Sequence, residues 1–265
     1  MSSTATADPR PVGPSDPSGE VLLSARGVSL SFGSVRALKD VDLDLRAGEI
    51  TAIVGDNGAG KSTFVKCVSG VYRPDAGAMT LGGESIAFAD PQEARRAGIE
   101  TVHQSLALVE DLAVWQNLYL NRELTKGVGP LRVLDRRAMK SGARDMVSGL
   151  SVNVPSTTAR VRRLSGGQRQ AVAICRAAGF SSRLVIMDEP TAALGVQETE
   201  RVEALIRRLR DDGRAVLLVS HNFAQVMRLS DQVWVMRSGR CAAGRRTAET
   251  TGEEIVALIT GAQSS

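Results

Sequence analysis

The chain has 265 residues, of which 43% are apolar, and a net charge of +4 from 33 Lys and Arg against 29 Asp and Glu. This length is enough to bury a sizeable core in one large domain or two small ones. No run of 18 apolar residues occurs, so we expect no membrane-spanning helix in this chain. Aromatic residues make up only 3% of the chain and do not interleave with its basic clusters, so we expect no nucleic-acid partner.

The first 19 residues are rich in Pro, Ser and Gly and contain no apolar stretch. We therefore expect residues 1–19 to be a disordered leader and not a signal peptide. The three cysteines, Cys67, Cys175 and Cys241, are far apart and lack the spacing of metal ligands. Cys67 and Cys175 lie in apolar helical runs, where a free thiol behaves as a small core residue. This cysteine usage fits a reducing cytoplasm.

Short β-rich runs follow the leader. Gly27 and Gly33 separate them, and they predict a small antiparallel sheet with strands at Val21–Ala25, Val28–Phe32 and Val41–Leu45.

Strands and helices then alternate along the chain. The apolar run Ile50–Val54 predicts a buried strand, and the apolar spacing after it predicts a helix over Ser62–Ser69. From about Pro91 to Gly179 the sequence pattern predicts mostly helices. Arg183–Asp188 and Arg214–Val219 are near-continuous apolar runs of the kind found in buried parallel sheets. The sequence therefore predicts an α/β fold with a mostly parallel sheet, an antiparallel β subdomain and an inserted helical subdomain.

The segment GDNGAGKST joins the first buried strand to its helix. It comprises Gly55, Asp56, Asn57, Gly58, Ala59, Gly60, Lys61, Ser62 and Thr63. A Cβ at Gly58 or Gly60 would crowd an anion held by the inward N–H groups of such a loop. Lys61 would reach the β- and γ-phosphates, and the Ser62 hydroxyl would coordinate Mg²⁺ at the helix N-terminus. The segment therefore predicts phosphate binding.

Two carboxylates, Asp188 and Glu189, end the next apolar run, where α/β proteins place their ligand sites. Asp188 is suited to hold Mg²⁺, and Glu189 to orient or deprotonate an attacking water. His221 ends the following strand and is suited to hydrogen-bond the γ-phosphate or that water. Gln104 ends another short apolar run, and its amide oxygen is suited to reach the Mg²⁺ or the water.

A second glycine-rich segment opens an amphipathic helix. It is LSGGQ, formed by Leu164, Ser165, Gly166, Gly167 and Gln168. With GDNGAGKST, Gln104, LVIMDEP and SH in this order, it resembles the ATP-binding cassette of ABC transporters. The resemblance implies a P-loop NTPase core of the ABC ATPase fold, with residues 20–265 as one domain. It also implies a helical subdomain at about 98–171 that carries LSGGQ as the signature motif.

The resemblance further implies the roles of these residues. ATP and Mg²⁺ are the cofactors, and Phe32 stacks on the adenine. Gln104 and His221 are the Q-loop glutamine and the switch histidine, which join Glu189 as catalytic residues. The signature motif binds the γ-phosphate of ATP held by a second copy, so the working unit is a homodimer. Its glycines and Ser165 expose N–H groups at a helix N-terminus, which suits an anion.

Several stretches are similar in sequence to the ATPases of ribose, xylose and fructose importers. These are GDNGAGKST, Pro190–Thr199 and Val256–Ala262. This similarity implies separate membrane permease subunits, a solute-binding protein and a peripheral position on the cytoplasmic face of the membrane. Two alternatives remain open: an importer for another small solute such as an amino acid, and a soluble ABC ATPase outside transport.

One position departs from the family pattern, because Gly195 stands where most cassettes have an Asp that crosses to the partner copy. This departure puts the usual coupling between the two ATP sites in doubt. The segment Leu106–Trp115, just after Gln104, has more apolar residues than a solvated loop needs. It predicts either a groove for a permease helix or simply the core of the helical subdomain.

Overall fold

The structure is a computed structural model, and it describes residues 19–127, 131–180 and 182–262. Apart from Gly19, the predicted disordered leader lies outside the described residues.

A six-stranded sheet forms the centre of the molecule, in the order β12-β11-β3-β10-β9-β6. Its strands are β3 (Ile50–Val54), β6 (Ile99–Val102), β9 (Leu184–Asp188), β10 (Ala215–Val219), β11 (Gln232–Arg237) and β12 (Arg240–Arg246). All neighbours pair in parallel except β11 and β12. The predicted mostly parallel sheet is therefore confirmed.

Both faces of the inner strands β3, β9 and β10 are buried, which explains why these three strands are almost entirely apolar. In β9, Val185 and Met187 pack into a core with the helices α5 and α6, whereas Leu184 and Ile186 face a second core. The second core lies between the central sheet, α1 and an antiparallel sheet. Alternate residues of one strand therefore serve two cores.

The antiparallel sheet has the order β2-β1-β4-β5. Its strands are β1 (Val21–Phe32), β2 (Val35–Arg46), β4 (Ala76–Leu81) and β5 (Glu84–Ile86). The prediction of separate strands on either side of Gly27 is wrong, because β1 runs through that position. Gly27 has φ +61°, and the pairing register with β2 shifts between Ala25 and Val28. The glycine therefore marks a bulge within one strand.

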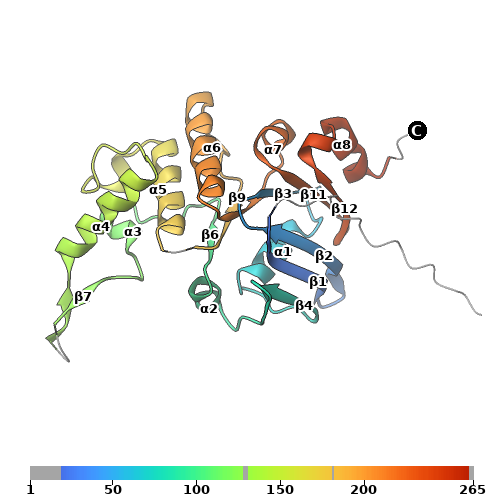
Figure 1. The fold of residues 1–265 in the computed structure, drawn as a ribbon, viewed down its shortest axis with the longest axis horizontal. Coiled ribbons are helices and arrows are strands. Elements are labelled where there is room, and N and C mark those ends of the chain that lie inside the picture. Colours follow the sequence, from blue (N-terminus) through green and yellow to red (C-terminus); the bar gives the residue numbers. More distant parts are fainter. Residues whose placement is uncertain (1–18, 128–130, 181, 263–265) are drawn as a thin grey trace, which may run out of the picture.

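Helices cover the central sheet, and α3, α4 and α5 gather at the end of the molecule far from β1 and β2 (Figure 1). The helices are α1 (Lys61–Val68), α2 (Pro91–Arg96), α3 (Val114–Leu118), α4 (Arg136–Gly149), α5 (Gly166–Ala178), α6 (Val196–Asp211), α7 (Phe223–Leu229) and α8 (Gly252–Thr260). Short 3-10 turns lie at Val161–Arg163 and Thr247–Glu249, and a two-stranded hairpin pairs β7 (Thr125–Lys126) with β8 (Val133–Leu134). Among the described residues, no helix is both long and apolar enough to cross a bilayer.

The segment predicted as the helical subdomain, about 98–171, contains α3, α4, β7 and β8. It also contains β6, which belongs to the central sheet, and the first half of α5. The division of residues 20–265 into a core with this insertion stays a prediction.

Candidate functional site

The phosphate loop connects β3 to α1, as the sequence predicts. Gly60 is the residue before α1 and has φ +103°, and a Cβ added there would lie 2.9 Å from the Ala37 carbonyl oxygen of β2. Gly55 has φ +149°, and its Cβ would clash with the carbonyl of Met236 in β11. The loop therefore needs glycine both for its backbone angles and because two other strands press against it.

Lys61, the first residue of α1, reaches back over this loop. Its Nζ donates to the carbonyl oxygens of Gly55 at 2.6 Å and Asp56 at 2.9 Å. Burial lowers the pKa of Lys61, and the charges of Glu189, Asp56 and Asp188 oppose that shift. The ammonium group therefore lies close to the carboxylates at the end of β9, which are 127 and 128 positions further along the chain (188 − 61 and 189 − 61).

The two carboxylates lie at the carboxyl edge of the central sheet. Burial raises the pKa of Asp188, with a further contribution from the negative charge of Glu189, while His103 and Lys61 oppose it. Glu189 has φ +51°, a conformation uncommon for residues other than glycine, and its N–H donates to the Val219 carbonyl at 2.9 Å. That bond fixes Glu189 against the end of β10, just before His221.

His221 contacts Glu189 twice. Its backbone N–H donates to Glu189 Oε1 at 2.9 Å, and its Nδ1 lies 2.7 Å from the same oxygen. The imidazole is 79% exposed and the Glu189 side chain only 17%. The histidine therefore covers the carboxylate from the solvent side.

Gln104 follows the edge strand β6, which pairs with β9 so that Val102 lies opposite Met187. The chain thus leaves β6 beside Asp188, and the exposed Gln104 lies two residues beyond the pairing. Its neighbour His103 has a pKa lowered by burial, and Asp188 is the first of the charges acting on it. The structure therefore brings His103 as well as Gln104 to this edge.

The donor set at this edge suits Mg²⁺. Ser62 is exposed in the first turn of α1, and Asp188 is half-buried at the end of β9. In the described part of the chain no group of three or more His, Cys, Asp or Glu is placed to hold a metal ion. When phosphates and water supply most ligands of Mg²⁺, the protein typically contributes only one or two oxygen ligands, such as this hydroxyl and carboxylate.

Phe32 lies at the end of β1, where the chain turns into β2, the strand that contacts Gly60. Phe32 is 47% exposed. It packs edge-to-face on Tyr72 with ring centroids 5.2 Å apart, and Lys66 Nζ lies 5.3 Å from the Tyr72 ring centroid. Tyr72 is half-buried and supports the exposed Phe32, so the face of Phe32 is a surface on which a base can stack.

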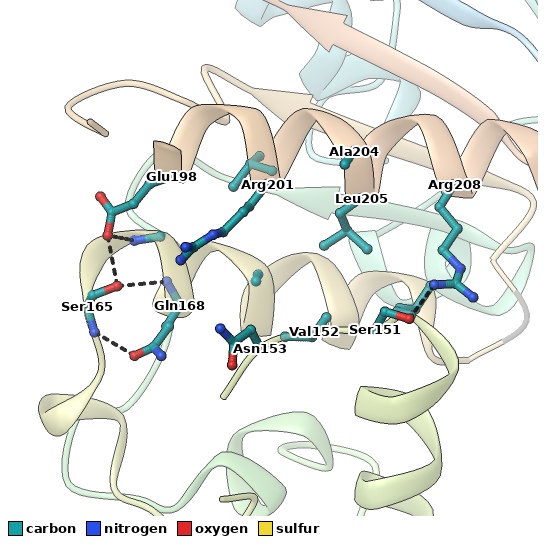
Figure 2. Close-up of a pocket in the computed structure, with 14 residues that line it drawn as sticks. Ser151, Val152, Asn153, Ser165, Gln168, Glu198, Arg201, Ala204, Leu205 and Arg208 are labelled. Carbon is teal, nitrogen blue, oxygen red and sulfur yellow. Dashed lines mark hydrogen bonds between the residues drawn. The ribbon is translucent and has the colours of Figure 1, made fainter. Parts of the chain in front are cut away.

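The LSGGQ segment forms the N-terminus of α5, away from the phosphate loop of the same chain. Leu164 is buried and anchors it, and Ser165 is the N-cap. Ser165 Oγ accepts from the Gln168 N–H at 3.3 Å, and Gln168 Oε1 accepts from the Ser165 N–H at 3.0 Å. This reciprocal pair is a capping box, drawn in Figure 2. Gly166 and Gly167 then present backbone without side chains.

The sequence profile of ABC transporters matches residues 38–192 of the chain. The chain belongs to the ABC transporter family.

Relatives within this family resemble the chain over most of its length. It is 46% identical to the fructose import ATP-binding protein FrcA of Rhizobium meliloti, over 92% of this chain and 95% of the relative. It is 41% identical to the xylose/arabinose import ATP-binding protein XylG of Sulfolobus acidocaldarius, over 90% and 94%. The ribose import ATP-binding protein RbsA 2 of Streptomyces coelicolor is 40% identical over 92% of this chain, which spans only 46% of that longer relative.

Solved ABC cassettes share the fold. A nucleotide-free ATP-binding cassette from an ABC transporter superposes with a TM-score of 0.76 at 24% identity, over 91% of this chain and 96% of the other. A dimeric bacterial ABC transporter cassette gives 0.70 at 24% identity, over 85% and 99%. The predicted ABC ATPase fold is therefore confirmed.

Within this ABC transporter fold, sequence reasoning missed three residues near the candidate site. His103 adjoins Gln104, so proximity along the chain was a usable signal for it. Tyr72 was missed because its contact with Phe32 joins residues 40 positions apart (72 − 32). Glu198 was missed because its contact with Ser165 joins residues 33 positions apart.

The segment Leu106–Trp115 was predicted to be either a groove for a permease helix or part of the core, and the structure has features of both. Its last three residues are buried in the core, whereas Ala107 is exposed and lines a cavity.

Proposed function

We propose that the chain is an ATP-hydrolysing subunit that energises import of a simple sugar through a separate membrane permease. The observation that carries this proposal is the meeting of Lys61, Asp188, Glu189 and His221 at one edge of the sheet. The names of the relatives, which import fructose, xylose or arabinose, and ribose, support the choice of a sugar.

In this proposal ATP binds across the phosphate loop, with Phe32 and Tyr72 on the adenine side. Lys61 leaves the carbonyl oxygens of Gly55 and Asp56 and pairs with the β- and γ-phosphates. The loop N–H groups from Asp56 to Thr63 and the N-terminus of α1 hold the phosphate oxygens. Ser62, Asp188 and the amide oxygen of Gln104 would hold Mg²⁺, which would neutralise charge on the phosphates.

Glu189 acts on the attacking water. Its carboxylate orients the water and accepts its proton, because it lies at the sheet edge that faces Lys61. His221 holds Glu189 Oε1 through two contacts and keeps the carboxylate turned toward the site. The exposed imidazole is then available to the γ-phosphate.

The active form is a homodimer in which two ATP molecules lie between copies. Leu164, Ser165, Gly166, Gly167 and Gln168 of one copy face the phosphates bound by the other copy. The dimeric state described for one structural neighbour supports this arrangement. Gly195 caps α6 at the position where an Asp would cross the interface, and it offers no side chain there.

We place the permease contact at a cavity of about 390 Å³ between α2, β6 and the C-terminal part of α5. Arg95, Arg122 and Arg176 line it together with Ala107. Arg122 pairs with Glu100, and Arg176 donates to the Ala107 carbonyl at 2.8 Å. The cavity therefore joins the segment after Gln104 to α5, whose N-terminus carries the signature segment. This contact holds the chain on the cytoplasmic face of the membrane, where the permease receives sugar from a solute-binding protein.

Uptake by cells tests the transport role. Cells whose only copy carries Glu189→Gln should lose uptake of one labelled sugar from a panel of ribose, xylose, arabinose and fructose. Cells carrying Glu200→Gln, an exposed acid on α6, should keep it. Unchanged uptake of every sugar, or loss of amino-acid uptake instead, would overturn the sugar assignment.

A further inference from the structure

The Glu198 side chain, from the first turn of α6, covers the N-terminus of α5. Its Oε1 accepts from Ser165 Oγ at 2.9 Å and lies 3.4 Å from the Gly167 backbone nitrogen, which also donates to it. Figure 2 shows the carboxylate beside Ser165, with dashed lines to both donors. One carboxylate oxygen therefore accepts hydrogen bonds from both the hydroxyl and an N–H of the signature segment.

Close packing holds the side chain in this place. A Cβ added to Gly167 would lie 2.8 Å from Glu198 Cβ and 2.9 Å from its Cγ. Glycine at position 167 thus lets the Glu198 side chain lie flat against the α5 backbone. The hydrogen bonds from Ser165 and then Gly167 lower the pKa of Glu198. The group at this helix N-terminus is therefore an ionised carboxylate at neutral pH.

The proposed function assigns the same two donors to the γ-phosphate of ATP bound by the second copy. Two anions do not share one hydroxyl and one N–H, because each donor has a single proton and like charges repel. We propose that Glu198 is an internal substitute for that phosphate: it keeps the signature segment ordered in the open chain and must be displaced when two copies close on ATP. This inference rests on the proposed function, and it adds that Glu198 competes with the γ-phosphate for the same donors of the signature segment.

The structure also offers a place for the displaced carboxylate. Arg201 lies three residues further along α6, on the same helix face as Glu198. No hydrogen bond or ion pair joins Arg201 to any residue in the described parts of the chain, and its charge contributes to lowering the pKa of Glu198. Both side chains line a cavity of about 230 Å³ between α5, α6 and residues 150–153, shown in Figure 2. Glu198 therefore has both space and a cation to turn toward.

The test titrates ATP into the Glu189→Gln chain and follows dimer formation by light scattering. Glu198→Gln keeps the size of the side chain and an oxygen that accepts from Ser165, but removes the charge that strengthens those bonds. We expect the ATP concentration for half-maximal dimer to fall by about fivefold to tenfold, since charge-assisted hydrogen bonds are about twice as strong as neutral ones. Glu200→Gln, on an exposed neighbour in α6, should leave it unchanged.

Arg201→Gln provides an independent second variant with the opposite expectation, because it removes the alternative partner of Glu198. Its dimer should need about severalfold more ATP, while the affinity of the monomer for a fluorescent ATP analogue stays the same. An unchanged or higher ATP requirement for Glu198→Gln would overturn the inference, as would an unchanged requirement for Arg201→Gln. If the Glu189→Gln chain binds no ATP or forms no dimer at all, the proposed function itself fails, and that outcome is distinct from these.

Discussion

His221 Nδ1 lies 2.7 Å from Glu189 Oε1, and the His221 backbone N–H donates to the same oxygen at 2.9 Å. The two residues directly follow the neighbouring parallel strands β9 and β10, whose last residues Asp188 and Val219 pair, so the sheet sets their separation. The bond from Glu189 N–H to the Val219 carbonyl locks the pair further. A carboxylate fixed in this way loses little freedom when it accepts a proton from water.

Removal of the imidazole should therefore impair hydrolysis while sparing ATP binding. We expect His221→Ala to lower the ATPase rate by about 10²-fold to 10⁴-fold, the range for a lost or misplaced acid–base group. A coupled phosphate-release assay measures the rate, and calorimetry with ATP serves as the control for binding. A His221→Ala chain that hydrolyses ATP at the parent rate would contradict the role given to this pair.

Lys61 is the predicted phosphate-binding cation, and its Nζ donates to two carbonyls of its own loop. Lys61→Ala should abolish measurable binding of ATP with Mg²⁺ in calorimetry, because the β- and γ-phosphates lose their side-chain partner. Lys140→Ala is a suitable control, since Lys140 is exposed on α4 and lies over the Trp115 ring. Equal affinity in the Lys61→Ala and parent chains would mean that this loop is not the phosphate site.

The proposed permease contact is tested by cross-linking from single introduced cysteines. Ala107→Cys should cross-link to the permease in the assembled transporter, because Ala107 is exposed and lines the arginine-rich cavity. Asp111→Cys should not, since Asp111 lies outside that lining and pairs with Arg162. Leu108 is a poor probe because it packs against the core. Cross-linking from 111 but not from 107 would place the contact elsewhere.

The native cysteines should not interfere with that experiment. Cys67, Cys175 and Cys241 are all buried, as predicted for the first two, and burial raises the pKa of each thiol to about 12. At pH 8 only about one thiol in 10⁴ is then ionised, and the thiolate is the reactive form. We expect no alkylation of the folded chain by iodoacetamide in mass spectrometry and three modifications after denaturation. The Ala107→Cys chain should gain one modification when folded, and labelling of folded parent chain would contradict the burial.

The sequence predicted where the contiguous parts of the candidate site lie in the fold. The phosphate loop lies between an apolar strand and an amphipathic helix, and Asp188 and Glu189 follow a strand that is apolar because both faces are buried. Parallel strands place such ends on one edge, so their meeting followed from the pattern. The length of β1 did not follow, because Gly27 has the same signature in a bulge as in a turn.

Contacts between helices distant in sequence were beyond that reasoning. The Glu198 carboxylate reaches Ser165 only because α5 and α6 pack side by side, and a glutamate in the first turn of a helix carries no sign of this partner in the sequence. The position of β6 at the edge of the central sheet could not be predicted from the sequence either. It depends on pairing with β9, more than 80 positions further along (184 − 99 = 85), and not on the composition of a four-residue strand.

The most direct test of the central claim is the Glu189→Gln chain, examined with ATP by size-exclusion chromatography with light scattering and by phosphate release. The substitution keeps Lys61, Ser62 and Asp188, so ATP should still bind. We expect hydrolysis to fall by about 10²-fold to 10⁴-fold, and a species of twice the mass of the 28.1 kDa chain to accumulate. Adding Ser165→Arg should prevent that dimer, because a long side chain would fill the space of the γ-phosphate. Hydrolysis at the parent rate by Glu189→Gln would contradict the account, because Glu189 would then not be the group that acts on water.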